Sequence, residues 1–142
     1  MARICLDASL VLARLLPLER TTEIIDVWNG LADRGDELRG PPLLFIEVTS
    51  VLRERFAQRQ ITGHQAEVAF LAFQDLPIER AWPDELHTRA WEIAKALGQR
   101  KAYDAHYLAL AEIEGCELWS MDKRLYNAAG GRIPWLKLIG EA

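Results

Sequence analysis

Hydrophobic residues recur along this chain in short runs that alternate with longer segments of helical spacing. The first run, residues 3–7 (RICLD), is apolar up to its closing acid. It predicts a buried central strand, because strands covered on both faces show no polar alternation. Residues 8–16 have the composition of a helix, and Pro17 ends it, since a proline inside a helix loses a hydrogen bond and clashes with the preceding turn. Asp7 therefore lies at a strand-to-helix junction.

Four further segments carry apolar residues at the three- and four-residue spacing of a helix, with predicted boundaries near 21–33, 43–58, 65–74 and 84–97. The expected inner faces are Ile24, Ile25, Trp28 and Leu31 in the first, Leu44, Val48, Val51, Leu52 and Phe56 in the second, and Val68, Phe70, Leu71 and Phe73 in the third. Residues 38–42 predict a link that contains a turn, with room for a brief strand.

The chain is expected to be organised around residues 100–114 (RKAYDAHYLALAEIE), whose apolar positions predict a buried helix. Residues 77–82, 116–121 and 134–139 read as strands, and the last is expected at an edge because it begins at Pro134. Residues 123–129 make one or two helical turns. Strands that alternate with helices predict an α/β sandwich with a mostly parallel sheet.

Composition places the chain among single-domain globular proteins. Its 142 residues suit one domain over 1–142, and 50% apolar with 27% charged residues is the balance of a water-soluble fold. No segment approaches the ~20 uncharged residues of a membrane span, and Asp7 and Arg14 contradict a signal peptide. Cys5 and Cys116 suit buried thiols of a reducing cytoplasm better than a disulfide, although a bridge is not excluded.

A formal net charge of -4 argues against a protein that holds nucleic acid by bulk positive charge. This argument from net charge is weaker if several acids lie in one pocket and bind divalent cations. The formal net charge then misstates the electrostatic field that a phosphate group would meet there.

Four acids stand at the ends or borders of apolar segments. Asp7 and Asp122 follow predicted strands, Asp104 lies in the first turn of a predicted helix, and Glu47 borders an apolar helical stripe. Taken singly, the three aspartates could be helix caps and Glu47 a surface acid. Ligands of parallel sheets collect at the carboxyl ends of strands, so the acids could also converge in one pocket.

Converging carboxylates repel one another unless a cation neutralises them. Oxygen-only ligands favour Mg²⁺ or Mn²⁺, and the three histidines show no spacing that suggests a transition-metal site. One such ion, or a pair of ions about 4 Å apart, would suit the cleavage of a phosphodiester bond.

Four pieces of sequence, LDAS, PPLLFIEVTSVL, AYDAHYLALAE and WSMDKRL, occur in one order across nearly the whole chain. In this the chain resembles PIN-domain ribonucleases, and more narrowly the VapC-type toxins of toxin–antitoxin pairs. The resemblance implies a three-layer α/β/α sandwich, a Mg²⁺- or Mn²⁺-dependent endoribonuclease, a small cognate antitoxin and a homodimer. It implies that Asp7, Glu47, Asp104 and Asp122 are the catalytic and metal-binding acids.

Further residues could position the substrate. Ser9 matches the small hydroxyl residue that follows the first acid in this family, and Ser120 stands where threonine is commoner. Both could instead satisfy backbone groups at turns. Four basic residues near the acids in sequence could meet phosphates or be ordinary surface charges. They are Arg14, Arg53, Lys101 and Lys123.

Other function classes fit less well. An aspartyl phosphatase would want a second Asp two positions after the first, where Ser9 stands. A phospho-receiver module needs adjacent early acids and a late pocket Lys that this chain does not offer. Two alternatives stay open: a PIN-like module that binds RNA or protein without cutting, and a housekeeping RNA-processing nuclease.

Overall fold

A computed structural model describes residues 1–140 of the chain. Its centre is one sheet of five parallel strands in the order β3-β2-β1-β4-β5. The strands are β1 Arg3–Leu6, β2 Glu37–Gly40, β3 Ile78–Arg80, β4 Glu117–Ser120 and β5 Leu136–Leu138. The predictions that the first strand is central and the last lies at an edge are therefore confirmed.

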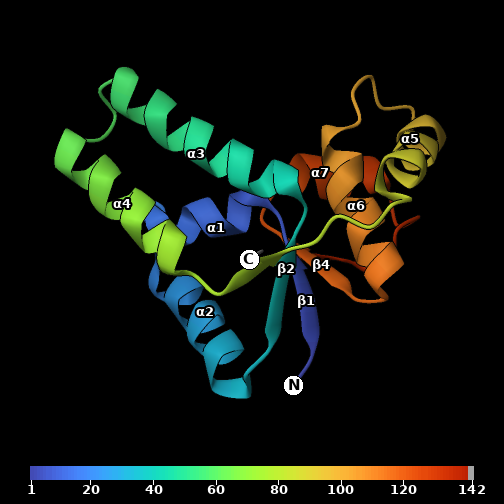
Figure 1. Ribbon diagram of the computed structural model, residues 1–142, viewed down its shortest axis with the longest axis horizontal. Helices are drawn as coiled ribbons and strands as arrows, with labels where there is room; N and C mark the ends of the chain where they lie inside the picture. Colours follow the sequence, from blue (N-terminus) through green and yellow to red (C-terminus); the bar gives the residue numbers. More distant parts are fainter. Residues whose placement is uncertain (141–142) are drawn as a thin grey trace.

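The described residues form seven helices, which cover both faces of the sheet and make a three-layer α/β/α sandwich (Figure 1). One group, α1 to α4, lies on one side, and α5 to α7 lie on the other. The helices are α1 Ala8–Leu15, α2 Thr22–Arg34, α3 Pro42–Ala57, α4 Gly63–Asp75, α5 Leu86–Leu97, α6 Tyr103–Glu114 and α7 Lys123–Ala129. None of these helices is long and apolar enough to cross a membrane.

Helix α6 is the core element that the sequence predicts, although it begins at Tyr103 rather than Arg100. It packs against β1, β4 and α5, and its residues from 107 to 111 are all buried. Gly115 ends it in the left-handed conformation, with φ 67°. This backbone region is open to glycine at no steric cost, which explains the sharp exit into β4.

Strand β2 is the brief strand for which the sequence-based expectation of a turn-containing link left room. Only Leu38 gives Glu37–Gly40 an apolar character, and yet the segment pairs with β1 on one side and β3 on the other. Its strand conformation comes from these two neighbours, because β-structure depends on pairing and packing more than on local preference.

Helices α2, α3 and α4 bury only some of the residues that were predicted to form their inner faces. Ile25, Phe56, Val68 and Leu71 are exposed, whereas α4 buries Ala69 and Phe73 and α3 buries Leu44, Val48 and Leu52. Helices α3 and α4 pack against each other and extend beyond the sheet (Figure 1). A helix at the margin of a fold contacts the core along part of its length, so apolar spacing alone overstates its burial.

Gly40, at the end of β2, occupies a position where there is no room for a side chain. A Cβ atom built on it would lie 2.3 Å from Leu44 Cδ2 and 3.3 Å from Leu44 Cβ, and Leu44 is fully buried. We expect Gly40→Ala to lower the free energy of unfolding by about 1–3 kcal/mol, since overpacking forces neighbouring side chains from their preferred rotamers. Urea unfolding measures the change. Gly30→Ala is the control, because Gly30 meets only the end of the exposed Arg34 side chain; an equal effect of the two substitutions would contradict the role of space at Gly40.

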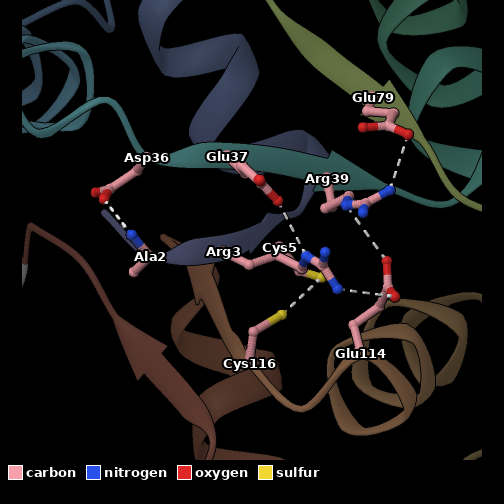
Figure 2. A network of polar contacts seen from close by, with 9 residues as sticks. All are labelled: Ala2, Arg3, Cys5, Asp36, Glu37, Arg39, Glu79, Glu114 and Cys116. Carbon is pink, nitrogen blue, oxygen red and sulfur yellow. Dashed lines mark hydrogen bonds and ion pairs between the residues drawn. The ribbon is translucent and has the colours of Figure 1, made fainter.

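A network of charged side chains joins the strands to α6 near the edge at which the strands begin (Figure 2). Arg3 contacts Glu37 at 3.2 Å and Glu114 at 3.5 Å. Arg39 contacts Glu79 at 3.0 Å and Glu114 at 3.4 Å. Glu114 thus fixes the end of α6 against β1 and β2, away from the edge where Asp7 lies.

Beside this network, the sulfur atoms of Cys5 and Cys116 are 3.4 Å apart, and both residues are free thiols (Figure 2). Cys5 is buried, as the sequence predicts, whereas Cys116 is only partly buried.

Candidate active site

Asp7 directly follows β1 and begins α1. Its carboxylate accepts hydrogen bonds from the Leu10 N–H at 3.3 Å, from the Ser9 hydroxyl at 2.6 Å, and from the Ser120 hydroxyl. Burial raises the pKa of Asp7 to about 6 although these three hydrogen bonds lower it, and the nearby charge of Asp122 raises it further. A carboxylate at this position is ionised at a free-energy cost that a cation would remove.

Ser9 and Ser120 connect Asp7 to the chain that leads to Asp122. Ser9 accepts a hydrogen bond from the Met121 N–H at 2.9 Å, and Ser120 accepts one from the Asp122 N–H at 3.0 Å. Ser120 is fully buried. Both serines therefore satisfy backbone groups, one of the two readings that the sequence allows, and they also orient Asp7.

Asp122 follows β4 as Asp7 follows β1, and these two strands are paired neighbours with Leu6 opposite Trp119. Asp122 caps α7 by accepting the Leu125 N–H at 3.1 Å. Asp7 and Asp122 are thus helix caps, and they also lie at the carboxyl ends of adjacent strands. The two readings of these acids are compatible.

Asp104 and Glu47 approach from helices on opposite sides of the sheet. Asp104 lies in the first turn of α6, and burial and the charge of Asp122 raise its pKa, while Arg124 lowers it. Glu47 lies on α3; burial raises its pKa, the hydrogen bond from Tyr107 lowers it, and Asp104 and Asp7 raise it. Each of the four acids is therefore linked by charge to at least one other, which places them around one region.

Glu47 and Asp104 line one cleft of about 870 Å³. Its wall also contains the basic residues Arg100, Lys101 and Arg124. Sequence reasoning selected Lys101 but passed over Arg100 and Arg124, although each adjoins a candidate lysine in the sequence. Basic side chains are common contacts of phosphate groups in nucleic acids.

The other candidate basic residues are placed differently. Arg53 lies over the ring of Phe56 at 5.5 Å and lines a separate cavity between α3 and α4. Arg14 is in the last turn of α1 and is not part of the cleft wall. Lys123 begins α7 next to Asp122. The structure brings Lys101 to the cleft, and it does not bring Arg53 there.

Tyr107 is a site residue that sequence reasoning missed. It lies on α6, is buried, and donates its hydroxyl hydrogen to Glu47 Oε1 at 3.0 Å. Burial, Glu47, Asp7 and Asp104 all raise its pKa. Its position three residues after Asp104 is the only local signal, because that spacing puts both side chains on one side of α6.

His87 and His106 form a contact that the sequence does not indicate. The rings meet at 2.9 Å between His87 Nδ1 and His106 Nε2, and His106 Nδ1 is 2.6 Å from the Ala102 carbonyl. A carbonyl cannot donate, so His106 Nδ1 carries a proton, and in the neutral ring Nε2 accepts from His87 Nδ1.

Within residues 1–140, no three His, Cys, Asp or Glu side chains already stand close enough to hold a metal ion. The four acids share a region, but Asp7 is turned to serine hydroxyls and Asp122 to the Leu125 N–H. The donor set is nevertheless all oxygen, the kind that Mg²⁺ and Mn²⁺ prefer, and three of its four carboxylates have raised pKa values.

Comparison with known proteins identifies the family. Residues 4–131 match the PIN domain. Ribonuclease VapC9 of Mycobacterium tuberculosis is 34% identical over 132 residues, 92% of this chain and 94% of the relative. Ribonuclease VapC12 of the same species is 31% identical over 98 residues, 68% of this chain and 73% of the relative.

Solved structures share the fold at low sequence identity. A complex named VapBC2 from Rickettsia felis, bound to a fragment of promoter DNA, contains a chain with a TM-score of 0.68 and 14% identity. That match covers 97% of both chains. FitAcB from Neisseria gonorrhoeae gives a TM-score of 0.64 at 16% identity, covering 89% of this chain and 93% of that one. With its match to the PIN domain over residues 4–131 and its VapC relatives, this chain belongs to the PIN-domain family and, within it, to the VapC ribonucleases.

Proposed function

We propose that this protein is a divalent-metal-dependent endoribonuclease that hydrolyses phosphodiester bonds in RNA, and that it is the toxin of a toxin–antitoxin pair. The observation that supports the proposal is that Asp7, Glu47, Asp104 and Asp122 lie near enough in a PIN-domain protein for their charges to affect one another. These acids come from the junction between β1 and α1, from α3, from α6 and from the turn before α7, so only the folded chain brings them near one another.

The same four carboxylates would hold Mg²⁺ or Mn²⁺. The fit rests on their oxygen donors and on the raised pKa values of Asp7, Glu47 and Asp104, which show unfavourable negative charge. When bound, such an ion activates water and stabilises the leaving oxygen of a phosphodiester. None of the four acids needs to act as a covalent nucleophile.

The chain's own residues bind and orient the substrate. Arg100, Lys101 and Arg124 on the cleft wall would contact RNA phosphates, which fixes the position of the backbone without reading the sequence. Ser9 and Ser120 keep the carboxylate of Asp7 in place. Attack by water, with the 3′ oxygen leaving, would produce a 5′-phosphate end.

A small antitoxin is the proposed partner, as in the VapBC2 complex of known structure. An apolar groove of about 390 Å³ between α3 and α4, lined by Leu52, Phe56 and Phe70, offers it a surface. Val68 and Leu71 on α4 are also exposed. We further propose a homodimer and a cytoplasmic location, in line with the sequence-based expectation.

The test is cleavage of RNA by the purified protein. We expect it to cut single-stranded or total cellular RNA in Mn²⁺ or Mg²⁺, to stop in EDTA, and to resume when the cation is returned. Sequencing of the cut ends identifies the 5′-phosphates. RNA that stays intact under all cation conditions, while the protein binds it, would instead support the non-cutting PIN-like module. Cleavage that is insensitive to EDTA would contradict the role of the cation.

A further inference from the structure

Tyr107 lies near three of the four proposed metal-binding acids and contacts one of them. Its side chain interacts electrostatically with Glu47, Asp7 and Asp104, and the tyrosine is only 2% exposed. It comes from α6, on the side of the sheet opposite to the helix that carries Glu47 (Figure 1). A tyrosine hydroxyl has one hydrogen to donate, so it can donate to only one of these acids.

The hydroxyl donates to Glu47, at 3.0 Å from Oε1. This hydrogen bond joins α3 to α6 beside the cleft that Glu47 and Asp104 line. Glu is a long side chain with three rotatable bonds, so a carboxylate without such a contact would occupy several rotamers. With Oε1 held, Oε2 is left for another ligand.

We infer that Tyr107 is a positioning residue that holds Glu47 ready to bind the divalent cation. The inference rests on the proposed function, because it concerns the same site. Tyr107 itself does not contact the ion; it acts through Glu47. Hydrogen-bond partners of this kind fix the orientation of a metal-binding carboxylate before the ion arrives.

A purely structural role for Tyr107 predicts a different outcome. If the hydrogen bond served only to give the buried hydroxyl a partner, removal of the hydroxyl would change the stability of the protein and leave its affinity for the cation unchanged. If it orients Glu47, its removal weakens cation binding even when the protein stays folded. The affinity for the metal alone therefore separates the two roles.

The experiment compares full-length wild-type protein with Tyr107→Phe by calorimetric titration with Mn²⁺ in the absence of RNA. We expect the Mn²⁺ dissociation constant to rise by about 10- to 100-fold, the usual effect of removing such a partner. Tyr126→Phe is the matched control, since Tyr126 is exposed on α7 and is not on the cleft wall. An unchanged dissociation constant in folded Tyr107→Phe would overturn the inference.

Cleavage measured against Mn²⁺ concentration gives a second readout. Tyr107→Phe is expected to need proportionally more Mn²⁺ for half-maximal rate, and to recover most of the wild-type rate at saturation. A rate that stays low at saturating Mn²⁺, with unchanged affinity, would contradict a role in cation binding.

A double variant covers the case in which Tyr107→Phe is unstable on its own because it leaves the Glu47 charge without its donor. Glu47→Gln removes that charge. If Tyr107 acts through Glu47, then Tyr107→Phe added to Glu47→Gln leaves the Mn²⁺ affinity of Glu47→Gln unchanged. A further loss of affinity would show that Tyr107 acts by another route and would overturn the inference.

The two proposals fail in different ways. Wild-type protein that binds Mn²⁺ but cuts no RNA would refute the nuclease function, while the Tyr107 inference would still be decided by the affinity of Tyr107→Phe. Wild-type protein that cuts RNA, with equal Mn²⁺ affinity in Tyr107→Phe, would refute only the role of Tyr107.

Discussion

Asp104→Asn is expected to abolish RNA cleavage, with a rate lower by on the order of a thousandfold, or ~4 kcal/mol of activation free energy. Asp104 lines the cleft with Glu47, and the nearby Asp122 and Arg124 act on its charge. Asparagine keeps the shape of the side chain but removes the negative charge that a hard cation needs. Initial rates on a labelled single-stranded RNA in Mn²⁺ measure the effect.

The Asp104→Asn protein should remain folded and become slightly more stable in EDTA, because burial and Asp122 make the charge of Asp104 unfavourable. Asp26→Asn is the matched control, since Asp26 is exposed on α2, outside the cleft. It should cleave as wild type does. Equal cleavage by Asp104→Asn and wild type would refute the assignment of Asp104, and with it the proposed catalytic site.

Asp7→Asn is expected to stabilise the metal-free protein at neutral pH and to have less effect in acid. The pKa of Asp7 is about 6 in the folded protein, against a reference of 3.8, because the carboxylate is buried. The folded state therefore favours protonated Asp7, and this preference adds to the free energy of unfolding. The added stability is fully present below the pKa that Asp7 has in the unfolded chain, and it is lost as the pH rises through about 6. The asparagine in Asp7→Asn is neutral at every pH, so the variant does not lose this stability as the pH rises.

The measurable quantity is the difference in unfolding free energy between Asp7→Asn and wild type in EDTA. It should grow by about 2 kcal/mol in favour of the variant between pH 4.5 and pH 7.5. The amide NH₂ group cannot accept the hydrogen bond that one of the two carboxylate oxygens accepts, but that cost of about 1 kcal/mol is the same at both pH values.

Urea unfolding at several pH values provides the data, with Asp26→Asn as the control that should give a difference independent of pH. Saturating Mg²⁺ should reverse the order, because a cation that binds only the folded wild-type site stabilises it. If the difference in unfolding free energy between Asp7→Asn and wild type does not vary with pH, then Asp7 is not an unfavourable buried charge in the folded protein.

Local signals in the sequence were sufficient for most elements. The apolar run before Asp7 predicts β1, the one before Asp122 predicts β4, and the structure confirms both. Helix α7 has the predicted boundaries of 123–129. These elements depend on neighbouring residues, on helix caps and on glycines that end helices, which are properties that a short window of sequence contains.

The sequence was less informative where an element depends on its neighbours in space. Within Glu37–Gly40 the sequence left room only for a brief strand, because β2 is stabilised by its pairing with β1 and β3 rather than by its own residues. Likewise, the apolar spacing of Val68 and Leu71 does not reveal that this face of α4 has no covering element among the described residues. Amphipathic spacing reports that a helix has an apolar face, and the packing of the whole chain decides what covers it.

The sequence by itself determined the alternation of strands and helices and the identity of four acids with matching placement. Only the tertiary structure decided that Ser120 bonds to Asp7 across 113 positions of the chain, and that Tyr107 donates to Glu47 across 60. The physical reason is that a hydrogen bond depends on distance and direction in space, and parallel pairing of β1 with β4 joins residues whose separation in sequence carries no such information.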